Sequence, residues 1–226
     1  VRVADRELAC CQFGKTENPQ PLMKARKKAL IAVIGAGLCG MTAAWVLTRK
    51  GYTVVLFDRE EHPGGQLWRL SDSQLPKDII LRESAKLEQT GIDLRNNTEI
   101  ELNAFDRSQY DAVLIATGVE EAVSKWLEEN GKGVSAIDTL TFETGITGVF
   151  CGGSILHPPS TVLSMADGKR TAISIDRYLQ KVSLTASRSS EGAQETRLYT
   201  NLEGIQPVSA VMPTTLFNGY TPDEAI

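Results

Sequence analysis

The feature that most constrains this chain is a glycine triplet, Gly35-x-Gly37-x-x-Gly40, within the stretch IAVIGAGLCG. A triplet at this spacing is informative only when it joins a strand to a helix. Here the apolar run LIAVI precedes it, as in a buried parallel strand, and residues 38–49 have helical character. A second apolar run, TVVLF, follows and ends at Asp58. The pattern therefore predicts a strand–helix–strand unit that binds a dinucleotide.

Each glycine has its own physical role in such a unit. The first permits the tight turn out of the strand, the second lets the backbone approach a pyrophosphate, and the third lets the helix pack closely against the strand. The helix that begins near Leu38 directs its N-terminus and its unpaired N–H groups at the phosphates. The predicted phosphate-binding turn is made of Gly35, Ala36, Gly37, Leu38, Cys39 and Gly40.

The residues after the second strand bear on which ribose the site accepts. Asp58 can accept hydrogen bonds from the hydroxyl groups of an adenosine ribose, whereas an arginine there would favour a 2′-phosphate. Arg59 is the next residue, so the sequence leaves this point open. FAD and NAD share this half-site, and a glycine-rich turn without any ligand is the structural alternative.

The rest of the chain continues the alternation of strands and helices. We expect strands at IDLR, TEIEL, DAVLIATG and ITGVFCGG, and helices over 76–90, over 120–130 and from 159 or 160 to about 179. This alternation predicts an α/β fold, a Rossmann-like domain with a mostly parallel sheet. We expect that domain over 28–181, an N-terminal arm or linker over 1–27 and a polar C-terminal tail over 182–226.

Composition restricts the class of partner. A net charge of -4 and a pI near 5.4 argue against nucleic acid. The uncharged run 29–47 is long enough for a membrane span, but its glycines divide it into strand, turn and helix, so we expect no membrane span. None of the four cysteines forms a C-x-x-C pair, which argues against a disulfide framework or an iron–sulfur cluster in this chain and favours a reducing, cytoplasmic compartment.

The histidines and serines suggest no further chemistry. His62 and His157 have no cysteine or histidine at ligand spacing, so we expect surface or turn positions and no metal site. Ser154 and Ser160 lie in no G-x-S-x-G elbow, which excludes a hydrolase of that type. The pattern names no catalytic residue.

Several further motifs, in order, resemble one known family. These are REEHPGGQLWRL, LPKDIILRESAKLEQTGIDLRNNTEI, YDAVLIATG, and TGVFCGG followed by PPSTVLSMADGKRTAISIDRYL. Over roughly 28–181 the chain resembles the FAD-binding half of the glutamate synthase small-subunit family, within the wider pyridine nucleotide–disulfide oxidoreductases. The resemblance implies that FAD is the cofactor.

The resemblance also implies which residues surround FAD. A second glycine turn would pass close to the flavin ring, and a small-residue turn would cover the cofactor. The start of the last helix would direct N–H groups at the flavin edge that becomes negative on reduction. Ser154 stands where the family usually has an aspartate, so it offers a hydroxyl in place of a charged acceptor. The residues implied are Gly64, Gly65, Gln66, Leu67, Ile100, Ala116, Thr117, Gly118, Gly153, Ser154, Ser160, Thr161 and Val162.

The family's second nucleotide-binding domain, for NAD(P)H, has no room in this sequence. Only a short segment separates Gly118 from the last predicted strand, and 120–145 bridges the gap. Direct reduction by NAD(P)H is then not expected, and electrons would come from a redox partner protein or an iron–sulfur domain or subunit. VRVADREL resembles the end of the family's iron–sulfur domain, GYTPDEAI resembles the start of a helix before a cluster segment, and the chain begins without Met, so we expect a subunit or a fragment.

Two other functions remain open. One is a flavin-free scaffold, a remnant of an oxidoreductase subunit kept for its contacts, which the serine at 154 and the missing domain suggest. The other is an NAD-binding dehydrogenase that uses the single glycine motif, for which no residue suggests itself as a base.

Overall fold

The computed structural model describes residues 27–188, and these contain one parallel β-sheet. Its strands lie in the order β3-β2-β1-β4-β5, and each neighbouring pair is parallel. The predicted α/β, Rossmann-like fold is therefore confirmed. The strands are β1 (Leu30–Ile34), β2 (Thr53–Phe57), β3 (Asp93–Arg95), β4 (Ala112–Ile115) and β5 (Val149–Cys151).

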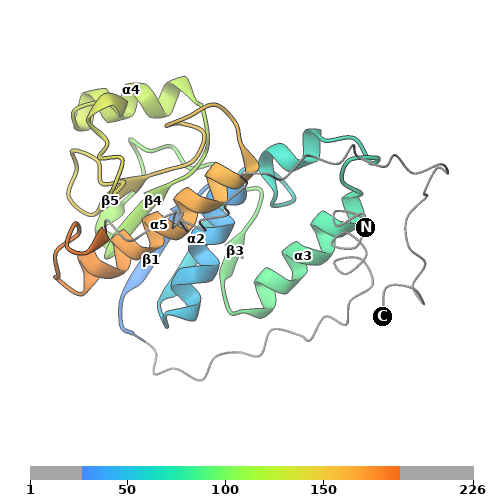
Figure 1. Ribbon diagram of the computed structural model, residues 1–226, viewed down its shortest axis with the longest axis horizontal. Helices are drawn as coiled ribbons and strands as arrows, with labels where there is room; N and C mark the ends of the chain where they lie inside the picture. Colours follow the sequence, from blue (N-terminus) through green and yellow to red (C-terminus); the bar gives the residue numbers. More distant parts are fainter. Residues whose placement is uncertain (1–26, 189–226) are drawn as a thin grey trace, which may run out of the picture. The chain divides into compact units, whose positions relative to one another are not determined.

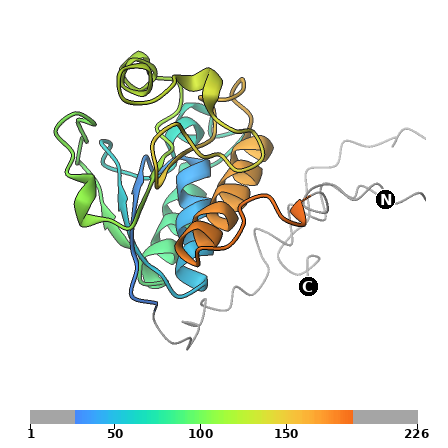
Figure 2. The same ribbon diagram turned by 90° about the vertical axis from the view of Figure 1, so that its left-hand side faces the viewer.

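Helices cover both faces of the sheet (Figures 1 and 2). On one face, Ile31 and Val33 pack against helices α2, α3 and α5 in a single apolar cluster. On the other, Ala32 and Ile34 pack against α4. Alternate residues of one strand thus supply both cores, which explains its continuous apolar sequence. The helices are α2 (Leu38–Arg49), α3 (Lys77–Gln89), α4 (Glu121–Asn130) and α5 (Thr161–Leu179), with short 3-10 turns η1 (Gly65–Arg69), η2 (Arg107–Gln109) and η3 (Val134–Ala136).

One predicted strand is wrong, and part of the sequence lies outside the described residues. TEIEL, at 98–102, forms no strand, because the preceding chain turns back to the end of β2: Thr98 N donates to Asp58 O at 2.8 Å and Asn97 N donates to Glu60 O at 3.0 Å. The described residues exclude 1–26 and 189–226, and with them Cys10, Cys11, nearly all of the predicted arm, most of the predicted tail and both end segments that resemble iron–sulfur regions.

A buried carboxylate joins the amino ends of the strands to the end of α5. Asp176, on α5, accepts hydrogen bonds from Lys27 Nζ at 2.8 Å, Lys50 Nζ at 2.7 Å, Tyr52 Oη at 2.7 Å and Gln180 Nε2 at 2.7 Å. Burial opposes ionisation of this carboxyl, but the four donors outweigh burial and hold the pKa of Asp176 well below its ordinary value. The ionised form of Asp176 therefore stabilises the fold.

We expect Asp176→Asn to lower the free energy of unfolding by about 2–3 kcal/mol at neutral pH, because two ammonium groups lose their shared counter-charge. Because the folded-state pKa is lowered, the contribution is fully present above the unfolded carboxyl pKa of about 3.9, declines below it, and is lost as pH falls through the folded-state pKa. Urea unfolding at pH 7, 5 and 3 would measure this. The exposed pair Asp93–Arg95 supplies the control: Asp93→Asn should change stability by less than about 1 kcal/mol. An equal loss from Asp176→Asn at pH 7 and pH 3 would contradict the assignment.

Candidate dinucleotide-binding site

The first glycine turn is built by close backbone approaches between β1, α2 and β4. Gly35 has φ +101, and its N–H donates to Phe57 O at 2.7 Å. A Cβ on Gly35 would lie 2.6 Å from Ala116 O, and a Cβ on Gly40 would overlap the carbonyl oxygen of Gly35. These two positions therefore require glycine, as the sequence predicts for the turn and for the packing of helix on strand.

The N-terminus of α2 is open toward the space above the sheet. Gly37 is its N-cap residue, no side chain caps the helix, and no acidic residue lies in its first turn. A Cβ on Gly37 would meet nothing within 4 Å. The first N–H groups of α2 are thus left for an outside acceptor, the arrangement that binds a phosphate at a helix N-terminus.

The carboxylate of Asp58, directly after β2, stabilises this turn by accepting backbone hydrogen bonds. Its Oδ2 accepts the N–H of Ala36 at 2.5 Å, and its Oδ1 accepts the N–H of Glu60 at 2.9 Å. An ionised carboxylate has about four lone-pair sites, so two such bonds leave Asp58 able to accept from ribose hydroxyl groups as well.

A second glycine turn packs directly on the first. Gly64 N donates to Ala36 O at 2.8 Å, and a Cβ on Gly65 would lie 3.1 Å from the Cα of Gly37. Both glycines have positive φ, 132° for Gly64 and 52° for Gly65. The two turns thus form one backbone surface, which bulkier residues would separate.

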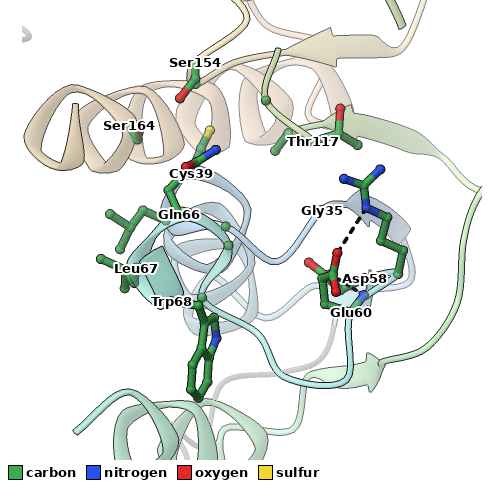
Figure 3. A pocket seen from close by; sticks show the side chains of 18 of the residues that line it. Gly35, Cys39, Asp58, Glu60, Gln66, Leu67, Trp68, Thr117, Ser154 and Ser164 are labelled. Carbon is green, nitrogen blue, oxygen red and sulfur yellow. Dashed lines mark hydrogen bonds and ion pairs between the residues drawn. The ribbon is translucent and has the colours of Figure 1, made fainter. Parts of the chain in front are cut away.

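These elements enclose one cavity of about 710 Å³ at the carboxyl ends of the strands (Figure 3). It lies beside β1 and β4, where the strand order reverses, which is the usual ligand position in an open parallel sheet. All but three of the predicted site residues line it: Ala36, Gly40 and Val162 do not.

The cavity wall also includes residues that sequence reasoning missed. Trp68 on η1 lines it beside His62, with ring centroids 5.5 Å apart, and its Nε1 donates to Pro63 O at 3.0 Å. Figure 3 places Asp58 and Glu60 together on one side of the cavity, away from Ser154 and Ser164. The motif WRL directly after the second glycine turn was the available signal for Trp68. Other lining residues that were not predicted include Ile34, Phe57, Glu60, Glu61, Arg69, Leu70, Thr98, Glu99, Glu120, Pro159 and Ser164.

The wall opposite Asp58 is formed by the turns after β4 and β5 and by the start of α5. Thr117, Gly118 and Ser154 line the cavity there. Ser160 is the N-cap residue of α5, and its Oγ accepts the N–H of Leu163 at 3.3 Å. This capping bond orders the first turn of α5 beside the cavity.

A buried contact between an aspartate and a histidine supports this wall from behind. Asp167, on α5, is 7% exposed, and its Oδ2 accepts the N–H of Gly153 at 3.1 Å and lies 2.9 Å from His157 Nε2. The sequence predicts only a surface or turn position for His157, but its side chain is 18% exposed and has this specific partner. The pair therefore fixes the turn that carries Ser154.

The two cysteines among the described residues are buried free thiols, Cys39 and Cys151. Burial raises the pKa of Cys39 above its ordinary value and raises the pKa of Cys151 to about 12. Both are thus protonated at neutral pH and poor nucleophiles.

Residues 27–188 contain neither a metal-ligand cluster nor a membrane-spanning helix. No group of three or more His, Cys, Asp or Glu side chains within this range is placed to hold a metal ion. No helix within it combines the length and the apolar character that crossing a membrane requires.

Fold and cavity together define a Rossmann-like domain with a candidate dinucleotide-binding site. Comparison with known proteins agrees: residues 33–78 match the family described as an NAD(P)-binding Rossmann-like domain. The crystal structure of Thermovibrio ammonificans THI4 is similar in fold, with a TM-score of 0.50 and 17% identity over 67% of this chain and 90% of that one.

Sequence similarity to curated proteins indicates more closely which class of protein this chain resembles. The glutamate synthase (NADPH) small chain of Bacillus subtilis (strain 168) is 35% identical over 127 residues, which cover 54% of this chain and 26% of that protein. The NAD-dependent dihydropyrimidine dehydrogenase subunit PreT of Escherichia coli (strain K12) is 32% identical over 118 residues, 49% of this chain and 28% of that protein. The matched region spans about a quarter of the length of these relatives. The resemblance to the glutamate synthase small chain is confirmed, and the chain is a partial homologue of oxidoreductase subunits.

The open backbone at Gly37 gives a sharp test of the phosphate site. Its φ of -73 and ψ of -179 suit any residue, so Gly37→Ala should change the free energy of unfolding by less than about 1 kcal/mol. The added methyl would stand in the cavity, so we expect binding of FAD or NAD⁺, whichever the protein takes, to weaken by on the order of tenfold.

Gly40→Ala is the matched control, measured by thermal unfolding and by ligand titration. Its Cβ would overlap backbone, so it should lower stability by about 1–3 kcal/mol or more. Unchanged ligand affinity in Gly37→Ala would show that no ligand approaches this turn.

Proposed function

We propose that this chain is an FAD-binding electron-transfer module of a larger oxidoreductase. The observation that carries the proposal is the contact between the two glycine turns, Gly64 N to Ala36 O at 2.8 Å, which makes one continuous backbone wall along the cavity. A dinucleotide site for NAD needs only the first turn. The second extends the wall beyond the phosphate turn, where a flat ring system would lie.

The residues present fit FAD in two independent ways. Among the described residues, the buried Oγ1 of Thr117 has no hydrogen-bond partner, although Thr117 lines the cavity. Buried hydroxyl groups are normally paired, so this one suits a ligand acceptor or donor. A Cβ on Gly37 or on Gly118 would point into open space, as in a cradle kept clear for a bound group.

Each wall then has a role in binding. The N–H groups at the start of α2 hold the phosphates, and Asp58 accepts from the adenosine ribose. Gly65, Gln66, Thr117 and Thr161 surround the ring end, with the N-terminus of α5 facing it. Bound FAD supplies one- and two-electron redox chemistry, and the partial positive charge of that helix end favours the reduced, more anionic state.

The electrons are proposed to come from a partner protein. Between β4 and β5 the chain forms only α4 and the short η3, so this segment contains no second nucleotide-binding fold. The relatives are described as a small chain and as a subunit, and this chain would likewise work beside a partner. A redox protein or an iron–sulfur domain or subunit would fill that role, with no need for a nicotinamide site here.

The first experiment is the visible absorption spectrum of the purified protein, with mass identification of any cofactor released on denaturation. We expect a flavin spectrum and FAD. NADH or NADPH added without oxygen should leave the flavin oxidised, whereas dithionite should bleach it.

The other outcomes of this experiment would each favour a different function or electron donor. Uptake of NAD⁺ without FAD would replace the proposal by the single-motif dehydrogenase. Failure to bind either, in protein that is folded by circular dichroism, would favour the flavin-free scaffold. Rapid bleaching by NADH would overturn the need for a partner.

Thr117→Val tests the orphan hydroxyl directly. Removing an unpaired buried hydroxyl should leave stability unchanged or raise it by up to about 1 kcal/mol, while FAD affinity should fall by roughly three- to tenfold, as for one lost hydrogen bond. Thr171 provides a matched control, because its Oγ1 is also buried and without a partner among the described residues but does not line the cavity. Thr171→Val should leave FAD affinity unchanged, and an equal effect of both variants would remove Thr117 from the site.

A further inference from the structure

Arg59 is a cation beside the carboxylate that is proposed to bind the ribose. It follows Asp58 and lines the cavity. A guanidinium at this place is what a 2′-phosphate needs, whereas the carboxylate of Asp58 suits free ribose hydroxyls. The two neighbouring residues therefore favour different ligands. Which ligand the site accepts depends on whether Arg59 is free to bind a phosphate or is held by other side chains.

Two carboxylates hold it. Arg59 Nη1 lies 2.9 Å from Glu120 Oε1, and Arg59 Nε lies 3.3 Å from Glu60 Oε1. Glu60 is adjacent in sequence and its side chain is 67% exposed, but Glu120 reaches across from the turn after β4 and its side chain is 28% exposed. Glu120 is therefore the more constrained partner.

The local structure frees the Glu120 side chain for this contact. Glu120 is the N-cap residue of α4, yet its side chain makes no capping bond. Its backbone is held instead, because Glu120 O accepts from Ser124 N at 3.2 Å. The residue belongs to 120–145, the segment that stands in place of the family's second nucleotide domain.

The surrounding charge opposes a 2′-phosphate. Against Arg59 and Arg69, the cavity is lined by the carboxylates Asp58, Glu60, Glu61, Glu99 and Glu120. A phosphate dianion would have to displace Glu120 from Arg59 and remain among the other carboxylates. Rejection of a wrong ligand by placed like charge is an established route to specificity.

We propose that Glu120 determines ligand choice at this site: by holding Arg59, it makes the adenosine end reject 2′-phosphorylated dinucleotides. This inference rests on the proposed function only in that the cavity binds a dinucleotide. It adds a selectivity residue supplied by the bridging segment rather than by the glycine motifs.

The test compares two small probes that differ only in the 2′-phosphate, AMP and adenosine 2′,5′-bisphosphate. Binding to flavin-depleted protein is measured by calorimetry at low ionic strength, where charge effects are least screened. The wild type should prefer AMP. In Glu120→Gln, affinity for the bisphosphate should rise by roughly tenfold, as for one charge-assisted contact, while AMP affinity stays within about twofold.

Two further variants test whether the gain in bisphosphate affinity depends on Arg59 and not on net charge. Glu121→Gln removes the same charge from the next residue, which is exposed and does not line the cavity, and it should change neither affinity. Arg59→Ala combined with Glu120→Gln should lose the gain, because the gain requires the released guanidinium.

The outcomes separate this inference from the proposal it rests on. AMP binding with no gain for the bisphosphate in Glu120→Gln overturns the role of Glu120 alone. A gain that persists without Arg59, or one equalled by Glu121→Gln, overturns it too by reducing the effect to net charge. Failure of AMP to bind any variant overturns both the inference and the dinucleotide site.

Discussion

The close backbone contact at Gly35 is the constraint on which the rest of the site depends. Its N–H bonds to the last residue of β2, its missing Cβ makes room for Ala116 after β4, and its carbonyl lies where a side chain on Gly40 would stand. Three elements therefore meet at one residue. Because α2 can approach β1 this closely, its N-terminus opens over the strand ends, and the second glycine turn can rest on the first.

The sequence predicted what local patterns encode. Apolar runs and glycine spacing were enough for β1, α2, β2 and the phosphate turn, because these depend on neighbours within a few residues. It failed at TEIEL, where alternation suggested a strand but the hydrogen bonds from Asn97 and Thr98 to the end of β2 decide the path. Such bonds join segments far apart in sequence, so no local pattern contains them.

In the candidate site, too, some features were predictable from the sequence and others were not. The glycines and small residues were predictable because each stands where the backbone must approach another segment or a ligand closely. The contacts between side chains were not predictable from the sequence. Glu120 meets Arg59 only once the loops after β4 and β2 are brought to one edge of the sheet. His157 with Asp167 and Trp68 beside His62 depend on how the single segments after β5 and β2 fold.

The proposed separation of electron donor and flavin follows from how the two ends of the cavity are built. The adenosine end is closed in by charged side chains from two loops, including Glu120 of the bridging segment. The proposed ring end is lined largely by glycines, hydroxyl groups and a helix N-terminus, with Gln66 beside them. Such a site would suit the redox group proposed above, whose charge balance the helix end would adjust. The reaction proposed for it, electron exchange with another redox centre, needs proximity and no catalytic side chain.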